Sequence, residues 1–419
     1  MRHFKPSILA LFALAVAGLL VVAGCSSSAP APAATQAPAK AAEPTKAAAP
    51  AAAAPTTAAA PAAAPAAGKA VAIKIGVIAP MSGDVKTFGE STKNGFDMAV
   101  AEANKGGKVQ ITTVVADDKN DPTEGVNAAT KEINQDKVKA IVGSVSSKVS
   151  IPISEVAQTN KVVQISPTST NEKVTVDGGK RKDFVFRACF IDPFQGTVMS
   201  KFALNTLKAK TAAVMYDVGN DYTKGLAEYF RSGFEKAGGK VTSYDSYGKD
   251  DVDFSAVLTK VASNSPDVLF LPDYYNKVSL IGKQAREKGV KAVFLGGDGW
   301  DSSDLDVKAM EGGYFSNHYS PEDKRPEVQD WVKKYQAKYN SVPDALATLG
   351  YDATNILING IVVAGSDDTA KIRDAMAATK DFKTVSGTVT FDKDGNPIKS
   401  AVVLQIKDGK QKFVESVAP

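Results

Sequence analysis

Beyond about residue 70 the chain alternates short apolar runs, rich in β-branched residues, with longer amphipathic segments. The apolar runs cover 72–78, 109–116, 140–142, 162–165, 212–216, 268–271 and 292–295. Amphipathic segments between them include 92–104, 125–135, 225–236 and 280–288. Short buried strands separated by helices of this length are typical of βαβ units, whose strands are parallel. Most of the chain is therefore predicted to be α/β with parallel central sheets.

The C-terminal part follows a different pattern. Three consecutive helices are predicted over 326–339, 345–364 and 369–378. Two closing strands, 387–391 and 401–406, are predicted to pair through a turn at Asp394-Gly395-Asn396. The roughly 350 residues after residue 69 exceed what one small core accommodates, so two lobes are expected.

The N-terminus has the pattern of a secretory signal. Arg2 and Lys5 precede an apolar run over 8–23, which ends at Val22-Ala23-Gly24-Cys25. These four residues resemble a bacterial lipobox, and the resemblance implies cleavage after residue 24 and a lipid on the sulfur of Cys25. The alternatives are an uncleaved anchor helix, or an ordinary signal with a chance cysteine. No apolar run of about 18 residues is expected after the signal, so no further membrane span is predicted.

Residues 25–70 are predicted to form a disordered linker behind the lipidated cysteine. After Cys25 they are almost wholly Ala, Pro, Thr, Ser and Lys, with too little apolar bulk to offset the entropy of ordering. Prolines stiffen such a segment, so we expect a spacer that holds a domain up to about 100 Å from a bilayer. The alternative is a filler without function.

The remaining composition excludes several classes of protein. The net charge of +4 comes from scattered lysines rather than a basic block, so no nucleic-acid partner is expected. The second cysteine, Cys189, lies in an apolar stretch and is predicted to be a buried small side chain. With Cys25 lipidated, no intramolecular disulfide is available.

Two loops at the ends of predicted strands are rich in hydroxyls. They are Gly143–Ser147 and Ser166–Thr170. Open α/β sheets bind ligands beyond the carboxyl ends of their strands, where hydroxyls and free N–H groups favour anions. A carboxylate suits this position. The alternative is that these residues only cap the following helices.

Several segments along the chain, taken together, are similar to a known family. The matching segments are Ile75–Gly83, Phe88-Gly89, Gly95–Asn104, Asp117–Pro122, Val142–Ser147, Ile165–Thr170, Tyr222 with Gly225, Tyr274 with Gln284–Arg286, Gly296–Gly299 and Gly350–Ala353. Together they resemble the leucine/isoleucine/valine-binding proteins of ABC importers, in order over 72–406. The resemblance implies the type I periplasmic-binding-protein fold, in which two Rossmann-like lobes are joined by three hinge crossings and hold a ligand between them. Lobe one would be 72–192 plus 321–396, and lobe two 193–320 plus 397–419.

The resemblance also implies which residues bind the ligand. The candidates are Phe88, Ser146, Ser147, Thr168, Ser169, Thr170, Tyr222, Tyr274, Asp298 and Trp300. Ser147 would hold the ligand carboxylate through its hydroxyl and N–H. Asp298 would neutralise the ligand ammonium, although the compared importers carry the longer Glu there.

The other candidates have implied roles as well. Thr168 would contribute a backbone carbonyl, and Thr170 a hydroxyl with its N–H. Tyr222 and Tyr274 would line the cleft from lobe two, and Phe88 would cover the ligand side chain. Leu346 falls near an aromatic position of the family, and Trp300 would supply the bulk instead.

This set matches the chemistry of an amino acid. A buried zwitterion needs hydrogen-bond donors for its carboxylate and an acid for its ammonium, because each unpaired buried charge costs several kcal/mol. Aromatic walls accept an apolar side chain. The alternative for Asp298 is a turn residue within Gly-Gly-Asp-Gly.

No arrangement typical of an enzyme, metal site or cofactor site is found. His318 is the only histidine beyond the signal, so a two-histidine metal motif is impossible and any Ser-His-Asp triad would depend on it. Asp392-Lys393-Asp394-Gly395 begins like a calcium loop, but Val403 stands where the closing acid belongs.

The sequence therefore predicts a monomeric, lipid-anchored, extracytoplasmic solute-binding protein. It would capture a neutral apolar amino acid, with Leu, Ile or Val as the first expectation, and deliver it to an ABC permease. Closure of the lobes would bury the ligand. The alternatives are a sensor of an amide, urea or an aromatic acid, and an extracytoplasmic enzyme or wall scaffold.

Overall fold

The computed structural model describes residues 69–419. The predicted signal peptide, the lipid site at Cys25 and all but the last two residues of the predicted linker lie outside the described residues.

The first sheet contains five parallel strands in the order β2-β1-β3-β4-β7. The strands are β1 (Val71–Ala79), β2 (Val109–Asp117), β3 (Ala140–Gly143), β4 (Val163–Ser166) and β7 (Val185–Arg187). Ile75 and Val77 of β1 pack into one core, whereas Ile78 packs into another. Alternation along the strand thus buries both faces of the sheet, as parallel sheets require.

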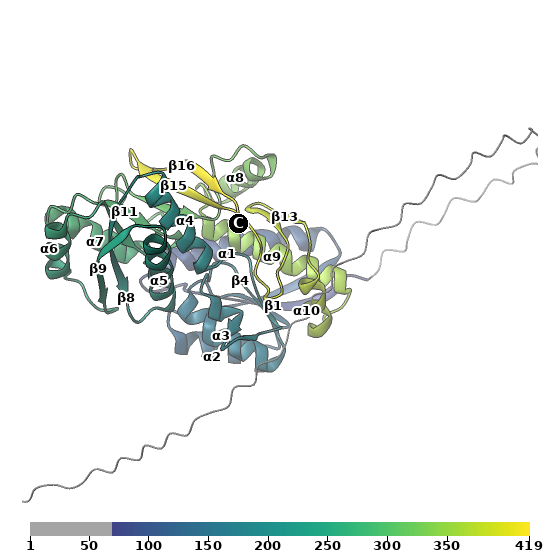
Figure 1. Cartoon of the computed structure of the whole chain (residues 1–419). Coiled ribbons are helices and arrows are strands. Elements are labelled where there is room, and N and C mark those ends of the chain that lie inside the picture. The colour runs from purple at the N-terminus through teal and green to yellow at the C-terminus, as the bar shows by residue number, and fades with distance from the viewer. Residues whose placement is uncertain (1–68) are drawn as a thin grey trace, which may run out of the picture. The chain divides into compact units, whose positions relative to one another are not determined.

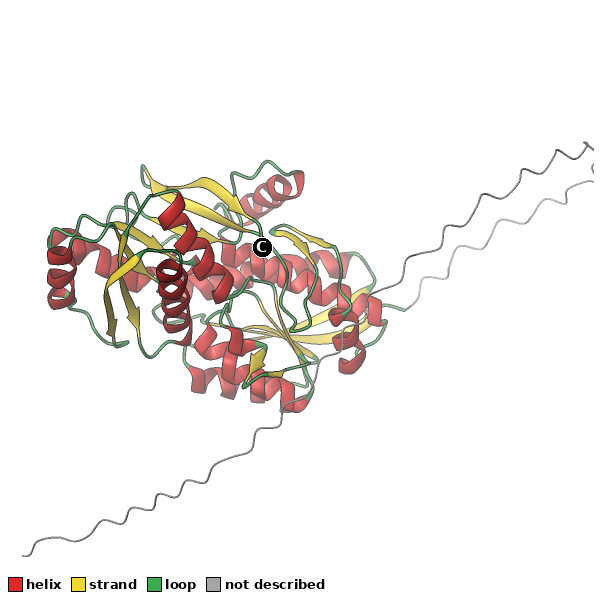
Figure 2. Cartoon of the chain, viewed as in Figure 1, coloured by secondary structure: helices red, strands yellow, loops and turns green. Residues whose placement is uncertain are grey.

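Helices cover both faces of this sheet (Figure 2). One face carries α1 (Lys86–Lys105), α9 (Ala345–Ala364) and α10 (Thr369–Ala377), and the other carries α2 (Pro122–Asn134) and α3 (Ser147–Asn160). By length and composition alone, α9 is apolar enough to cross a membrane, contrary to the expectation that no such run follows the signal. It runs beside α1 in the protein core, where 67% of its apolar window is buried (Figure 1).

The second sheet contains seven strands in the order β16-β15-β12-β11-β10-β8-β9. The strands are β8 (Thr211–Asp217), β9 (Lys240–Tyr247), β10 (Val268–Leu271), β11 (Val293–Gly296), β12 (Tyr314–Asn317), β15 (Ala401–Lys407) and β16 (Lys410–Val417). The helices packed with it are α4 (Asp192–Asn205), α5 (Asp221–Lys236), α6 (Ser255–Asn264) and α7 (Tyr275–Glu287). β15 and β16 are antiparallel to their neighbours, and the other pairs are parallel.

Seven further elements complete the described part. They are η1 (Glu172–Val174), β5 (Val176–Asp177), β6 (Lys180–Arg181), η2 (Asp298–Trp300), α8 (Pro326–Tyr339), β13 (Phe382–Thr384) and β14 (Gly387–Val389). On α8, Trp331 packs against Tyr335 and Tyr351, and its indole N–H donates to Thr348 Oγ1 at 3.0 Å. This cluster also includes Met98 of α1, so α8 belongs with the first sheet.

The predicted fold class is confirmed: two α/β lobes with parallel central sheets. The chain passes between the lobes three times, after β7, after β12 and before β15. Because each lobe collects separate stretches of sequence, side chains from distant positions meet at the boundary between the lobes.

The predicted hairpin between 387–391 and 401–406 is wrong. β14 pairs with β13, and β15 pairs with β12 and β16. The turn itself forms, with the Asp392 carboxylate accepting from the N–H groups of Asp394 and Asn396, but only one bridge joins Phe391 to Pro397. The ring of Phe391 packs against Phe186 in the first lobe, so the turn leads the chain from one lobe to the other.

Candidate ligand-binding site

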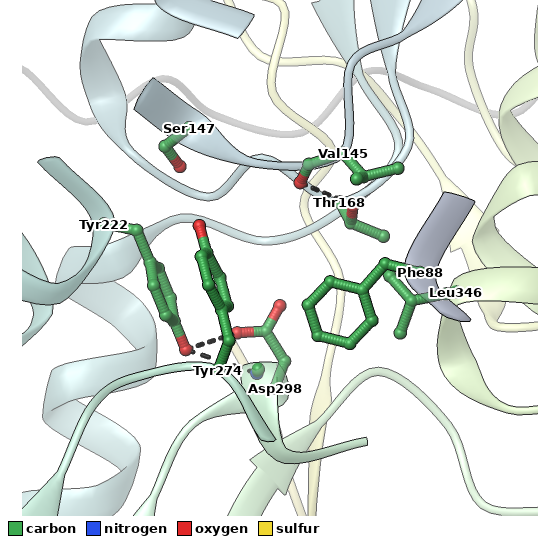
Figure 3. A pocket seen from close by; sticks show the side chains of 9 residues that line it. Phe88, Val145, Ser147, Thr168, Tyr222, Tyr274, Asp298 and Leu346 are labelled. Atoms are coloured by element: carbon green, nitrogen blue, oxygen red, sulfur yellow. Dashed lines mark hydrogen bonds between the residues drawn. The ribbon is translucent and has the colours of Figure 1, made fainter. Parts of the chain in front are cut away.

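A cavity of about 280 Å³, part of it open to solvent, lies between the two lobes. Its lining residues are Phe88, Val145, Ser147, Thr168, Tyr222, Tyr274, Asp298, Gly299 and Leu346 (Figure 3). The space is small, and in this arrangement of the lobes it has no room for a nucleotide or a sugar chain.

Lobe one contributes two hydroxyl side chains to the cavity, both from loops after sheet strands. Ser147 is the first residue of α3, and its hydroxyl accepts from the backbone N–H of Asn171 at 3.2 Å. Thr168 follows β4 and donates to the carbonyl of Val145 at 2.8 Å. These bonds join the two loops, so the hydroxyls that face the cavity have fixed positions.

Three other predicted residues of these loops do not line the cavity. Ser146 donates to Asn120 Oδ1 at 2.7 Å, and Ser169 donates to Ser150 Oγ at 2.7 Å. Thr170 is buried, and within residues 69–419 its hydroxyl has no hydrogen-bond partner. Ser146 and Ser169 therefore stabilise the loops through hydrogen bonds outside the cavity.

Lobe two places Asp298 opposite these hydroxyls, at the start of η2 and just after β11 (Figure 3). Oδ1 accepts from the hydroxyl of Tyr222 and from Nε2 of Gln195, both at 3.0 Å. Oδ2 lies 2.9 Å from Nε2 of His318. The side chain is 9% exposed. Three polar side chains therefore hold this buried carboxylate in place at the cavity wall, where it can meet a cation.

A steric constraint explains why a glycine, Gly297, precedes Asp298. A Cβ on Gly297 would lie 2.2 Å from Oε1 of Gln195 and 2.6 Å from the hydroxyl of Tyr222. Any larger residue would push these two donors away from Asp298. The Gly-Gly-Asp-Gly sequence therefore forms a turn and also lets the donors approach the carboxylate.

Aromatic and aliphatic side chains form the apolar walls. The rings of Tyr222 and Tyr274 stack with centroids 5.4 Å apart and an interplanar angle of 1°. Phe88 meets Tyr274 edge-on at 5.6 Å, and Leu346 lies beside Phe88 (Figure 3). Burial raises the pKa of Tyr222, so its hydroxyl stays protonated and can donate to Asp298.

Trp300 does not line the cavity, contrary to what its position beside Asp298 suggested. It is fully buried in lobe two, packs against Phe315, and donates its indole N–H to the carbonyl of Leu271 at 3.0 Å. η2 is a single tight turn, so adjacent side chains leave it in different directions. Leu346, not Trp300, forms this part of the wall.

Sequence reasoning missed the residues around Asp298. Gln195 lies within α4, and His318 was considered only as a metal or catalytic candidate. The side-chain amide of Gln195 also accepts from the backbone N–H of Asp298 at 3.1 Å, so it holds the acid at two points. Neither residue carries a local signal, because each contact joins positions that only the folded chain brings together.

Asp192 was missed as well. It is the first residue of α4 and is fully buried, and neither carboxyl oxygen has a hydrogen-bond partner in the described part of the chain. Its backbone N–H donates to the carbonyl of Thr170 at 3.0 Å. Burial raises the pKa of Asp192 to about 8. In the sequence, an acid before Pro193 is typical of a helix start and indicates nothing more.

Direct hydrogen bonds join the two lobes near the cavity. Tyr275 donates to the carbonyl of Asp84 at 3.1 Å, and the hydroxyls of Thr87 and Ser302 lie 2.9 Å apart. The carboxylate of Asp301 accepts from the N–H of Ala345 at 2.8 Å. The structure is therefore the closed arrangement, in which both lobes reach the same small space.

Comparison with known proteins identifies the family. The model of the periplasmic binding protein family matches residues 72–411. The Leu/Ile/Val-binding protein homolog 3 of Brucella melitensis is 35% identical over 331 residues, which are 77% of this chain and 88% of that protein. The leucine-, isoleucine-, valine-, threonine- and alanine-binding protein of Pseudomonas aeruginosa is 30% identical over 78% of this chain and 87% of its own length.

Solved structures agree with this result. A leucine-binding protein from Thermotoga maritima has a TM-score of 0.78 and 38% identity, over 83% of this chain and 99% of its own. A branched-chain amino acid transporter substrate-binding protein from Streptococcus pneumoniae, solved with isoleucine, has a TM-score of 0.77 and 31% identity, over 83% and 100%. These relatives are binding proteins and not enzymes. The chain belongs to the family of periplasmic binding proteins that includes the branched-chain amino acid binding proteins.

Proposed function

We propose that the protein binds leucine, isoleucine or valine between its lobes and delivers it to an ABC permease. The observation that carries this proposal is the polarity of the cavity. Hydroxyls lie on the lobe-one side, a hydrogen-bonded carboxylate lies on the lobe-two side, and apolar walls lie between them. An α-amino acid with an apolar side chain has the complementary arrangement of groups.

In this proposal the ligand carboxylate binds at Ser147 and beside Thr168, the two lobe-one residues with hydroxyls that line the cavity. The ligand ammonium binds Asp298 and the backbone carbonyl of Thr168. Asp298 is one methylene shorter than the glutamate of the compared importers, and the donors behind it compensate by fixing its carboxylate at the cavity wall. Phe88, Tyr274 and Leu346 enclose the ligand side chain.

Relatives support the choice of ligand. The names of the proteins from Brucella, Pseudomonas and Thermotoga include leucine, and the structure from Streptococcus contains isoleucine. At 30–38% identity over most of both chains, these relatives are similar enough to share a site architecture with this protein.

We further propose that the mature protein is monomeric and anchored outside the cytoplasm by a lipid on Cys25. The linker that ends at residue 70 would hold the two lobes away from the membrane. The three hinge crossings would separate lobe one, 72–192 with 321–396, from lobe two, 193–320 with 397–419. Replacing Cys25 by Ser should move the protein from the membrane fraction to the soluble fraction. Retention in the membrane would contradict the anchor.

Binding is tested by thermal unfolding of the full chain, extracted from membranes in detergent. The protein is unfolded, dialysed and refolded first, so that any amino acid retained from the cell is removed. A ligand at a thousandfold its Kd stabilises the folded state by about 4 kcal/mol, which raises Tm by several degrees. We expect this shift with leucine, isoleucine or valine.

The same assay separates the alternatives. A shift with an amide, urea or benzoate, and none with the three amino acids, would replace the importer proposal by the sensor. Ser147→Ala should weaken binding by about tenfold or more, because a hydrogen bond to a charged group contributes about 1.5–3 kcal/mol. Ser146→Ala is the matched control, since that hydroxyl is directed at Asn120 instead.

A further inference from the structure

His318 lies in the second crossing between the lobes, directly after β12. Its side chain is only 1% exposed, and its ring stacks on Phe190 with centroids 3.9 Å apart. Nε2 lies 2.9 Å from Oδ2 of Asp298. Neither the sequence motifs nor the proposed ligand contacts assign a role to this buried imidazole.

The surroundings determine which ring nitrogen carries the proton. A carboxylate only accepts hydrogen bonds, so Nε2 must donate to Asp298. The other nitrogen, Nδ1, is buried and has no partner among residues 69–419. A proton on Nδ1 would be buried without an acceptor, which costs free energy. The neutral Nε2–H tautomer is therefore the form that fits.

The charged groups near the ring shift the pKa of His318 in opposite directions. Asp298 and Asp301 favour the protonated imidazole, whereas Lys399 and burial disfavour it, and burial is the largest effect, so the pKa of His318 is lowered. Asp323 and Arg325 line the surface hollow on which the histidine also borders, and they form an ion pair with each other. Near neutral pH the histidine is consequently an uncharged donor.

We propose that His318 is a positioning residue for the ligand. As a neutral Nε2–H donor it orients Asp298 toward the ligand ammonium and leaves the negative charge of the acid uncompensated. This inference rests on the proposed function. An imidazolium at the same place would pair with Asp298 and remove the charge that the ammonium needs. The ligand ammonium and a proton on His318 therefore compete for one carboxylate.

Competition of this kind has a measurable consequence. Affinity for leucine should fall as the pH drops through the pKa of His318 in the free protein, and binding should release the proton that the histidine carries there. A histidine with a purely structural role would not couple ligand binding to a proton at its ring.

The test compares His318→Gln with His318→Leu by calorimetric titration of the full chain with leucine between pH 5 and pH 8. Gln retains an N–H donor that reaches about as far as Nε2 but does not titrate, whereas Leu removes the donor. At pH 7 we expect His318→Leu to weaken binding by about tenfold to a hundredfold. We expect the leucine affinity of His318→Gln to lie within severalfold of the wild-type value at pH 7. We also expect this variant not to lose affinity as the pH is lowered.

Nitrogen NMR of the histidine-labelled chain supplies a readout that does not depend on affinity. The sequence contains two histidines, His3 and His318, so the signal that disappears in His318→Gln is that of His318. We expect a protonated Nε2 and an unprotonated Nδ1 at pH 7. A protonated Nδ1, or equal leucine affinity of wild type and His318→Leu, would overturn the inference and leave the proposed function standing. Failure of the wild type to bind any of the three amino acids would overturn both.

Discussion

Two buried carboxyl groups of this protein, Glu132 and Asp298, are held in opposite ways. Glu132 lies between α2 and β1 in lobe one and is 1% exposed, and neither of its oxygens has a hydrogen-bond partner in the described chain. Asp298 lies at the ligand cavity and meets three side-chain donors. Burial raises the pKa of Glu132 to about 8, so at neutral pH this group is mostly uncharged.

Two other buried acids fall between these extremes. Asp118 accepts from Ser144 and from the backbone N–H of Asn120, and Asp273 accepts from Tyr247 and from the backbone N–H of Tyr274. Burial raises the pKa of each to about 6, and the hydrogen bonds oppose that rise. Comparison of Glu132 with Asp118 and Asp273 indicates that burial raises the pKa of an acid and that hydrogen-bond donors limit the rise.

The difference shows which property marks a functional acid in this fold. A ligand ammonium needs a partner that stays ionised after water is excluded, and only donors from the protein provide that. Donors distinguish Asp298 from Glu132, and position at the cavity distinguishes it from Asp301, a buried acid that also accepts from three donors. Three substitutions test this interpretation.

The largest effect is expected for Asp298→Ala. It removes the proposed partner of the ligand ammonium and leaves three donors unsatisfied. Breaking a buried ion pair costs about 3–5 kcal/mol, so the Kd for leucine should rise about a hundredfold to a few thousandfold. Calorimetric titration measures the change. Asp304→Ala, an exposed acid six residues further on, is the control. Unchanged affinity in Asp298→Ala would sink the proposed ion pair.

The second substitution, Glu132→Gln, should change stability and not binding. The folded state keeps Glu132 protonated up to about pH 8, whereas the unfolded chain loses that proton near 4.5. The folded state therefore binds more protons in this window, and wild-type stability should fall as pH rises from about 4.5 to about 8.

The variant lacks this group, so the unfolding free energy of Glu132→Gln relative to wild type should increase by on the order of 3 kcal/mol between pH 4.5 and pH 7. Urea unfolding at several pH values measures it, and other titrating groups cancel in the difference. A pH-independent difference would mean that Glu132 is ionised in the folded protein.

The smallest effect is expected for Tyr222→Phe, which removes one of the three donors to Asp298 and keeps the ring that stacks on Tyr274. Leucine affinity should fall about tenfold, the value of a single hydrogen bond to a charged group. Tyr339→Phe removes a hydroxyl that bonds to the carbonyl of Asn94, away from the cavity, and should leave affinity unchanged. Equal effects of the two variants would contradict a specific role for the donor.

The sequence predicted secondary structure correctly where a local pattern of apolar residues determines it. Runs such as 72–78 and 268–271 correspond to β1 and β10, because fully buried parallel strands need continuous apolar residues. Strands with mixed composition were not predicted. β16 contains Lys410, Lys412 and Glu415 and lies at a sheet edge, where only one face needs apolar side chains.

The candidate site was predictable to the extent that it lies on loops after strands. Ser147, Thr168, Tyr222, Tyr274, Phe88 and Asp298 all line the cavity. The environment of Asp298 was not predictable, because Gln195 and His318 reach it from another helix and another crossing. Trp300 was misplaced because neighbours in sequence on a tight turn do not share a direction.

The position of the two tryptophans gives the protein a built-in optical reporter. Trp300 lies in lobe two and follows Gly299, which lines the cavity, whereas Trp331 lies among tyrosines in lobe one. Each lobe thus carries its own fluorophore, and only the one in lobe two is next in sequence to a residue that lines the cavity. In Trp331→Phe, the emission of the remaining indole should report ligand arrival in real time without any attached dye.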